Sequence, residues 1–200
     1  MQIDLSTLKP GHVYGLLTQL LIPRPIAWVL SDNGNGEFNL APFSYFTGIS
    51  SNPPLLMISI GKKKGGSSKD TLANIENRDD FVVHIPSTNH QGDVTASADS
   101  LPVGESEVIK QGLELSDMTD FQLPRLKDCQ IAFACSKHQI IRLDGVAQSM
   151  VIGRVKSVYI ADEVVTVTEN DRMIVSATGV DPLCRLGSTE YGNIGKVISG

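Results

Sequence analysis

The sequence is poor in cysteine and lacks any excess of basic residues. Its three cysteines, Cys129, Cys135 and Cys184, show neither C-x-x-C nor zinc-type spacing, so neither a disulfide framework nor a structural metal site is expected. The 200 residues carry a net charge of -5, which offers no broad positive field to a phosphate backbone. We therefore expect no nucleic-acid partner.

Long hydrophobic runs are also missing. The first twenty residues contain Asp4, Lys9 and Pro10 and no unbroken apolar stretch, so we expect neither a secretory signal nor a membrane span, and a cytoplasmic location. Hydrophobic residues make up 41% of the chain and charged residues 20%, proportions typical of a packed globular protein. The length predicts a single domain over residues 1–200.

Histidine and tryptophan are scarce as well. The four histidines, His12, His84, His90 and His138, have no metal-ligand spacing and no evident serine or aspartate partner, which argues against a metal centre or a hydrolytic triad. We expect His84, which stands inside a β-rich segment, to be a structural residue. Trp28 is the only tryptophan and is expected in the core.

Several segments have the composition of β-strands. In residues 22–31, Ile26, Trp28 and Leu30 alternate with smaller apolar residues, and both prolines stand at the start, where a strand tolerates them. Two Asn-Gly pairs follow, which favour a hairpin turn. We expect further strands from about Glu37 to Ser51, over 52–61 and over 80–86, the last in a buried position.

The second half of the chain has weak and strong β patterns in turn. Residues 87–124 predict loops with one short helix around 104–112. The runs 127–143, 145–167 and 172–179 are β-rich, and the last twenty residues predict an extended tail. Because strands outnumber helices and follow one another directly, we expect an antiparallel barrel that is closed or partly closed.

Residues 60–75, IGKKKGGSSKDTLANI, place glycine, serine and lysine ahead of a helix start. Gly61 and Gly66 have the spacing that opens a P-loop, but the required Lys-Ser or Lys-Thr does not follow, so a nucleotide triphosphatase is not expected. A Gly/Ser loop that runs into a helix still favours an anion. Additional donors to that anion would be Ser67, Ser68, Lys69 and Thr71.

The acidic and basic residues beside this helix start have separate expected roles. Asp70 is placed to cap the amides of the first turn and to orient Lys69. Lys62, Lys63 and Lys64 are expected to form a solvated loop tip, as short lysine runs usually do.

Residues 38–54, FNLAPFSYFTGISSNPP, form a second polar-rich segment within an apolar one. Polar groups on a strand apolar enough to be buried need hydrogen-bond partners, and a flat heteroaromatic ligand would provide them. The polar residues concerned are Asn39, Ser44, Thr47, Ser50 and Ser51.

The segments PRPIAWV, NLAPFSYF, SSNPPLLMISI, KDTLANI and FVVHI follow one another in order, and MVIGRV and PLCRLGSTEY come later. In this order and spacing, from Ile22 to Tyr191, they resemble the FMN-binding, flavin reductase-like family of split β-barrel proteins. The resemblance implies a mainly β fold, namely a Greek-key split β-barrel with a few short peripheral helices, and a homodimer. It also implies FMN as the cofactor and NAD(P)H as the electron donor.

The resemblance further implies where FMN would bind. A phosphate at one end and a ring that gains negative charge on reduction need donors at both ends, and the two polar segments would supply them. The ring would be lined by Asn39, Ala41, Pro42, Phe43 and Ser44, the ribityl-phosphate end would be near Ser59 and Gly61, and the phosphate would be held by Lys69, Asp70 and Thr71. No side chain is assigned a catalytic role.

Two departures from the family concern the far side of the ring. Many relatives have Gly-Gly after the Arg-Leu of the tail, where this chain has RLGS, and many have histidine near Gln148 or Ser149. The roles of Arg185 and Tyr191 are therefore left unassigned.

The expected function is an FMN flavoprotein that acts as an NAD(P)H-dependent, flavin reductase-like oxidoreductase. Its partner would be a nicotinamide nucleotide or a redox partner protein. Two alternatives stay open: a non-enzymatic FMN electron carrier or storage protein, and an oxidase of the pyridoxamine-phosphate oxidase type.

Overall fold

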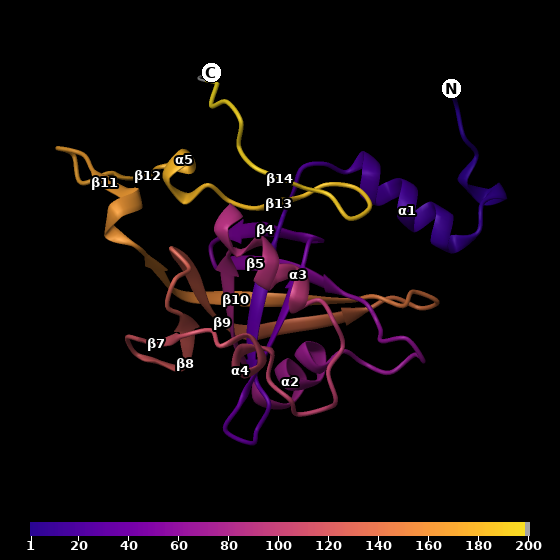
Figure 1. The fold of residues 1–200 in the computed structure, drawn as a ribbon, viewed down its shortest axis with the longest axis horizontal. Coiled ribbons are helices and arrows are strands. Elements are labelled where there is room, and N and C mark those ends of the chain that lie inside the picture. The colour runs from indigo at the N-terminus through magenta and orange to yellow at the C-terminus, as the bar shows by residue number, and fades with distance from the viewer. Residues whose placement is uncertain (199–200) are drawn as a thin grey trace.

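The computed structural model describes residues 1–198, and its centre is a seven-stranded sheet in which every neighbouring pair of strands is antiparallel. Figure 1 shows this sheet with short helices around it. In spatial order the strands are β3 (Phe38–Phe43), β2 (Ala27–Asp32), β6 (Asp80–Ile85), β9 (Ile131–Arg142), β10 (Ser149–Ile160), β5 (Pro54–Ile60) and β4 (Phe46–Ser51).

The centre of the sheet is buried on both faces, and β2 shows why. Trp28 and Leu30 enter one hydrophobic cluster, while Ala27 and Val29 enter a second cluster across the sheet. This period of two is the alternation that the sequence predicts for a strand. The predicted buried position of residues 80–86 is also confirmed, because β6 lies between β2 and β9.

The expected continuous strand from Glu37 to Ser51 is wrong. The chain breaks after β3, and the next strand, β4, lies at the opposite edge of the sheet. Only Ser44 and Tyr45 connect the two strands, and the Ser59 N–H donates to the Tyr45 carbonyl at 2.9 Å. The chain therefore changes edges at the point where the sequence suggests unbroken β structure.

Thr47, Ser50 and Ser51 lie on β4 and are exposed, so they are not the buried polar groups that the sequence predicts. β4 is an edge strand with a register shift between Gly48 and Ser50. Solvent can satisfy these hydroxyl groups, and no ligand is needed to explain them.

Three small sheets accompany the large one. The β7–β8 hairpin replaces part of the loop expected over residues 87–124, because Leu115 pairs with Leu126 and Met118 with Phe121. The predicted extended tail is confirmed in outline through residue 198, since β13 pairs with both β14 and β1; its last two residues lie outside the described part of the chain. The small sheets comprise β1 (Arg24–Pro25), β13 (Cys184–Arg185) and β14 (Tyr191–Gly192); β7 (Leu115–Met118) and β8 (Phe121–Leu126); and β11 (Val165–Val167) and β12 (Met173–Val175).

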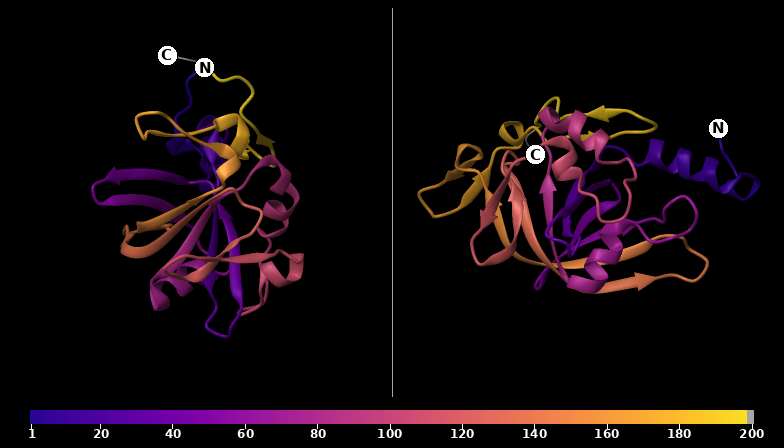
Figure 2. Two further views of the ribbon diagram at one scale, coloured as in Figure 1. Left: turned by 90° about the vertical axis from the view of Figure 1, so that its left-hand side faces the viewer. Right: turned by 60° about the horizontal axis from the view of Figure 1, so that its bottom comes forward.

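The helices are short and peripheral. The predicted helix starting near Asp70 is α2, and the one around 104–112 is α4. The longest helix, α1, was not expected, and Figures 1 and 2 show it extending to one side of the sheet. The helices are α1 (Pro10–Leu20), α2 (Asp70–Arg78), α3 (Gln91–Ala96), α4 (Glu107–Gln111) and α5 (Ala177–Val180), with 3-10 turns η1 (Leu5–Thr7), η2 (Thr88–His90) and η3 (Asp162–Val164).

His84 and Trp28 are core residues, as the sequence predicts. Both are fully buried, and the Trp28 indole N–H donates to Ser97 Oγ at 2.8 Å. His84 Nδ1 lies 3.0 Å from the Trp28 carbonyl, and the Leu126 N–H donates to His84 Nε2 at 2.9 Å. These two bonds place the proton on Nδ1 and join three strands through one imidazole ring.

Cys135 is buried in the sheet, where it packs in the second hydrophobic cluster as a small apolar residue. Burial raises the pKa of Cys129 to about 12, so this thiol is no nucleophile at neutral pH. Over residues 1–198, none of the helices has both the length and the apolar character needed to cross a membrane.

Candidate functional site

Three hollows meet at Pro42, near the β3–β4 connection. The smallest, here called the α2 pocket, has a volume of about 60 Å³. It is lined by Asn39, Ala41, Pro42, Lys63, Lys69, Asp70, Thr71, Ser97, Ala98, Asp99, Ser100, Leu101 and Glu107.

The largest of the three, here called the central pocket, has a volume of about 400 Å³. This volume is within the usual range for cofactor and ligand pockets, roughly 300 to 1,000 Å³. It is lined by Tyr14, Pro42, Phe43, Ser44, Tyr45, Ser59, Gly61, Lys62, Lys69, Ala147 and Gln148.

The third hollow, here called the Arg185 pocket, has a volume of about 230 Å³. It shares Tyr14 and residues 42–44 with the central pocket, and Ala98 with the α2 pocket. Its lining comprises Tyr14, Ile26, Pro42, Phe43, Ser44, Val94, Ala98, Arg185 and Tyr191.

The structure brings all ten candidate site residues to two adjoining pockets. Pro42 and Lys69 line both the α2 pocket and the central pocket, and so connect them. Each remaining residue lines one of the two: Asn39, Ala41, Asp70 and Thr71 line the α2 pocket, and Phe43, Ser44, Ser59 and Gly61 line the central pocket.

The start of α2 differs from its expected form. Lys69, not Asp70, is the N-cap residue, and it makes no side-chain capping bond. Asp70 instead pairs with Lys63, whose Nζ lies 2.8 Å from Oδ1 and 2.7 Å from Oδ2. The first helical bond runs from the Ala73 N–H to the Lys69 carbonyl, so the earlier amides of α2 are available to an anion.

The expected solvated tip of three lysines is therefore wrong for Lys63 and correct for the other two, which are exposed. The loop closes as a small hairpin, because Lys62 bridges Ser68 and the Lys63 N–H donates to the Ser67 carbonyl at 2.9 Å. This closure turns Lys63 back toward the helix start, where it meets the carboxylate of Asp70.

Thr71 and Asn39 form a buried polar pair at the base of the α2 pocket. The Asn39 amide donates to Thr71 Oγ1 at 2.9 Å, and both side chains are at most 3% exposed. Thr71 thus accepts a hydrogen bond from the protein, and its own hydroxyl proton has no acceptor among residues 1–198. That proton is available to a ligand in the α2 pocket.

Lys69 is a cation between the two pockets. Its Nζ lies 5.3 Å from the centre of the Phe43 ring, a distance at which a cation and a ring face attract. Burial lowers the pKa of Lys69, and the described residues provide no carboxylate within ion-pair distance of it. A half-buried ammonium without an acidic partner is suited to bind an anionic ligand.

The linings of the α2 pocket and the central pocket differ in charge. The lining of the α2 pocket includes two lysines and three carboxylates, Asp70, Asp99 and Glu107. The described lining of the central pocket includes Lys62 and Lys69 and no carboxylate. A phosphate dianion would therefore be favoured at Lys69, where the two pockets meet, beside the α2 amides.

The outer edge of β3 is held by the start of α4. Glu107 accepts a hydrogen bond from the Leu40 N–H at 2.8 Å, and Ser106 Oγ donates to the Phe38 carbonyl at 2.6 Å. Burial raises the pKa of Glu107, and the bond from Leu40 opposes that shift. These contacts satisfy an open strand edge and fix the strand that carries Asn39 to Phe43.

Arg24 fixes the other end of the same segment. Its side chain is buried, and Nε donates to Ser44 Oγ at 3.3 Å. The remaining donors bind carbonyls of Thr18, Leu21 (2.5 Å) and Leu186 (2.9 Å). One guanidinium thus joins the end of α1, the turn after β3 and the C-terminal segment.

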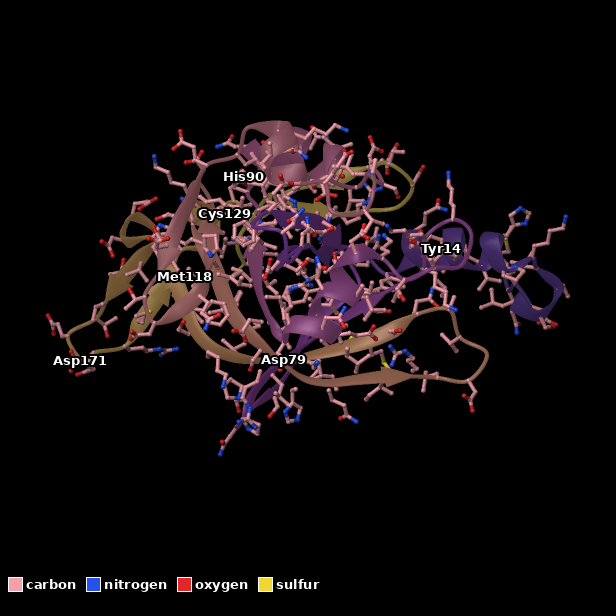
Figure 3. The ribbon with its side chains drawn as sticks, turned by 90° about the horizontal axis from the view of Figure 1, so that it is seen from below. Tyr14, Asp79, His90, Met118, Cys129 and Asp171 are labelled. Carbon is pink, nitrogen blue, oxygen red and sulfur yellow. The ribbon has the colours of Figure 1, made fainter. Side chains whose placement is uncertain are left out.

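Sequence reasoning missed two contributors to this region, Tyr14 and Arg24, and left the role of Gln148, which lines the central pocket, unassigned. Tyr14 of α1 lies edge-on to Tyr45 with ring centres 6.4 Å apart, and it lines two pockets. Figure 3 labels Tyr14 on the helix that extends beside the sheet. The motif PRPIAWV contains Arg24, and this arginine ahead of an apolar strand was the one available signal.

Within residues 1–198, the His, Cys, Asp and Glu side chains form no group of three or more that could hold a metal ion.

Comparison with known proteins gives one family and close structural neighbours. The sequence profile described as "Flavin reductase like domain" matches residues 19–175. Nitrilotriacetate monooxygenase component B from Bacillus cereus has 32% sequence identity to this chain. Its crystal structure superposes with a TM-score of 0.90 over 100% of this chain and 98% of that one. The 2-nitrobenzoate 2-nitroreductase of Pseudomonas fluorescens is 30% identical, with a TM-score of 0.86 over 100% of this chain and 94% of that one.

A more distant neighbour adds support for the fold alone. A protein of Shewanella frigidimarina with a split barrel domain is 18% identical and has a TM-score of 0.83, over 100% of this chain and 98% of that one.

Proposed function

Because the chain belongs to the flavin reductase-like family, we propose that it is a flavoprotein that binds FMN and acts as an oxidoreductase. The observation that carries the proposal is the meeting of two distant segments, residues 39–44 and 69–71, around two pockets that share Pro42 and Lys69. Two relatives at or above 30% identity, a monooxygenase component and a nitroreductase, also belong to redox systems.

The residues present fit FMN in charge and in size. Lys69, the first amides of α2 and the free hydroxyl proton of Thr71 would hold the phosphate. The central pocket has the volume for a fused ring system, and its wall at Pro42, Phe43 and Ser44 would line that ring. Asn39 and Ala41, which the resemblance places at the ring, line the α2 pocket instead, so they would lie nearer the phosphate. Ser59 and Gly61 would lie between these two ends. Asp70 would act on the site only through its ion pair with Lys63.

When bound, FMN would supply the redox chemistry by accepting a hydride from NADH or NADPH and passing electrons to an acceptor. The protein's residues would bind the phosphate, orient the ring and limit access of water. Arg24 would act as a positioning residue, since its bond to Ser44 fixes the hydroxyl at the ring wall. No side chain of the pocket lining is assigned a proton-transfer role.

The sheet order supports the Greek-key split barrel as the finer description of the fold. β3 and β4 are the two edges of the seven-stranded sheet, yet two residues connect them. A connection this short requires the sheet to curl until its edges approach. We propose one such domain for residues 1–200.

An apolar helix supports the proposal of a homodimer. α1 has no buried residue, and its apolar side chains are open to solvent: Tyr14 is 57% exposed and Leu20 is 66% exposed. Exposed apolar side chains on a protruding helix are typical of an interface. We further propose a cytoplasmic location and a nicotinamide nucleotide or redox protein as the partner.

FMN retention is the first test of the proposed function. Purified protein is mixed with excess FMN, desalted, and examined for flavin absorbance; an absence of bound flavin would overturn the proposal. Lys69→Met should weaken FMN binding by at least about tenfold, the effect of losing a charge-assisted hydrogen bond. Lys64→Met is the matched control, because Lys64 is exposed on the same loop and lines none of the three pockets.

Reduction of the bound flavin is the second test. Anaerobic stopped-flow mixing with NADH or NADPH should bleach the flavin absorbance rapidly if the protein is a reductase. Flavin that binds tightly but stays oxidised would identify an electron carrier or storage protein instead. Oxygen-dependent turnover of a phosphorylated amine would identify the oxidase.

A further inference from the structure

We propose that the Arg185 pocket binds a small aromatic carboxylate. This inference rests on the proposed function, because the pocket shares the wall formed by residues 42–44 with the central pocket. A ligand there would lie next to the proposed flavin ring, with residues 42–44 between the two.

The walls of the Arg185 pocket are suited to one flat ring. Tyr14, Phe43 and Tyr191 bring three aromatic rings from distant parts of the chain, and Ile26 and Val94 add aliphatic surface. Aromatic side chains favour stacked or edge-on contacts with another ring. The volume of about 230 Å³ is below the roughly 300 Å³ at which pockets for larger ligands begin, so the pocket suits a single-ring compound.

Arg185 is the one charged residue in the described lining of this pocket. Its guanidinium carbon lies 4.5 Å from the centre of the Tyr191 ring, and Nη2 donates to the Ser188 carbonyl at 2.7 Å. Within residues 1–198, Nε and Nη1 have no hydrogen-bond acceptor, and no carboxylate lies within ion-pair distance of the guanidinium. Those two positions leave the group able to bind a carboxylate.

The Tyr191 ring that supports Arg185 is itself held in place. The Tyr191 hydroxyl and Thr95 Oγ1 are hydrogen-bonded at 3.1 Å, which ties β14 to α3. The cation therefore rests on a fixed surface, and its planar group is pre-oriented for a planar anion.

A second arginine adds to the positive charge. Arg24 and Arg185 are directly opposite in the β1–β13 ladder, and like charges at such positions repel. Every recorded hydrogen-bond partner of Arg24 in the described chain is a neutral oxygen. Arg24 does not itself line the pocket, but its charge beside Arg185, with no carboxylate within ion-pair distance of either group in the described chain, favours an anion at Arg185.

Charge distinguishes this ligand class from the ring of a nicotinamide nucleotide, which carries a neutral amide. Benzoate and benzamide are therefore the two probes, because they have the same ring and nearly the same shape. Titration calorimetry of the FMN-loaded protein should show benzoate binding at least about tenfold more tightly than benzamide, the effect of a charge-assisted pair. Propionate, which has the charge without the ring, should bind weakly.

Arg185→Gln should remove most of this preference and weaken benzoate binding by at least about tenfold. Arg172→Gln is the matched control. Arg172 is exposed next to Asp171, which Figure 3 labels at the opposite end of the molecule from Tyr14. Equal binding of benzoate and benzamide to the unmodified protein, absence of benzoate binding, or unchanged binding by folded Arg185→Gln would each overturn the inference. The benzoate–benzamide comparison requires no variant and stands if Arg185→Gln does not fold.

The design separates this inference from the proposed function. FMN retention is measured first, and the benzoate titration is run on both the FMN-loaded and the flavin-free protein. Loss of FMN on desalting contradicts the proposed function, while the flavin-free titration still reports on the Arg185 pocket. Tight FMN binding with no preference for benzoate contradicts only the inference.

Discussion

His84 should make the protein less stable in mild acid. The imidazole is fully buried, and burial is the main cause that lowers its pKa to about 4, with its bond to the Trp28 carbonyl acting in the opposite direction. In the unfolded chain the pKa returns to its ordinary value of 6.5. Between these two values the unfolded chain binds a proton that the folded protein does not, so the free energy of unfolding falls as the pH falls.

The size of the effect follows from the two pKa values. The difference, 6.5 minus about 4, is about 2.5, and each pKa unit corresponds to about 1.36 kcal/mol. The full loss is therefore about 3.4 kcal/mol, reached only well below pH 4, and about 2 kcal/mol of it should be present at pH 5. This is a large part of the 5 to 15 kcal/mol by which folded proteins are typically stable.

Urea unfolding at pH 7.5, 6.5, 5.5 and 5.0 measures this dependence. Trp28, the only tryptophan, is buried beside His84 and reports unfolding through its fluorescence. His84→Gln should be less stable at pH 7.5 but should lose about 2 kcal/mol less than the unmodified protein on going to pH 5. His138→Gln, at an exposed position on β9, should keep the original slope.

Each variant gives a slope of unfolding free energy against pH. Comparing these slopes removes the contribution of other titrating groups, such as Glu107, because they are present in every variant. Parallel pH profiles for the unmodified protein and His84→Gln would show that His84 is not held neutral by burial.

Three further changes test the packing and the site. Gly153→Ala would place a Cβ 2.5 Å from Phe81 Cζ and should cost about 1–3 kcal/mol of unfolding free energy; unchanged urea unfolding would contradict that contact. Thr71→Val removes the hydroxyl and should weaken FMN binding about two- to tenfold in a fluorescence titration, whereas equal affinity would exclude this hydroxyl from the phosphate site. Gly187→Ala would place a Cβ 2.9 Å from Gln19 Cα and should loosen α1, seen as faster limited proteolysis before residue 24; an unchanged digestion pattern would refute this packing.

The parts of the fold that sequence reasoning predicted depend on local pattern. β2 follows the alternation of Trp28 and Leu30 because each face of the strand meets a different hydrophobic cluster. The turn after β2 follows its Asn-Gly pairs, where Gly34 and Gly36 adopt positive φ. The start of α2 was located within one residue for the same local reason.

The parts that sequence reasoning did not predict depend on contacts between distant residues. Nothing near Asp70 in the sequence shows that a hairpin returns Lys63 to it. The break between β3 and β4 is likewise set by the two edges of a sheet whose order emerges only in three dimensions. α1 is a different case: Val13, Leu16, Leu17 and Leu20 have the spacing of an apolar helical stripe, a local signal that sequence reasoning did not use, although no residue of this helix is buried.

The candidate site shows the same division. The residue types at Asn39, Lys69 and Thr71 are suited to an anion and a ring, but their meeting at one pocket follows from the packing of α2 against β2 and β3. Arg185 and Tyr191 gained a role only when the tail was seen beside β1.

The four bonds of Arg24 make one side chain a junction for both ends of the polypeptide. Residues 18 and 186 are far apart along the chain, yet each gives a carbonyl to the same guanidinium that holds Ser44. Shortening the protein ahead of residue 22, or trimming its last fifteen residues, would therefore release the ring wall from a distance, even though neither cut touches β3. Engineered versions of this protein should preserve both termini if cofactor affinity is to be preserved.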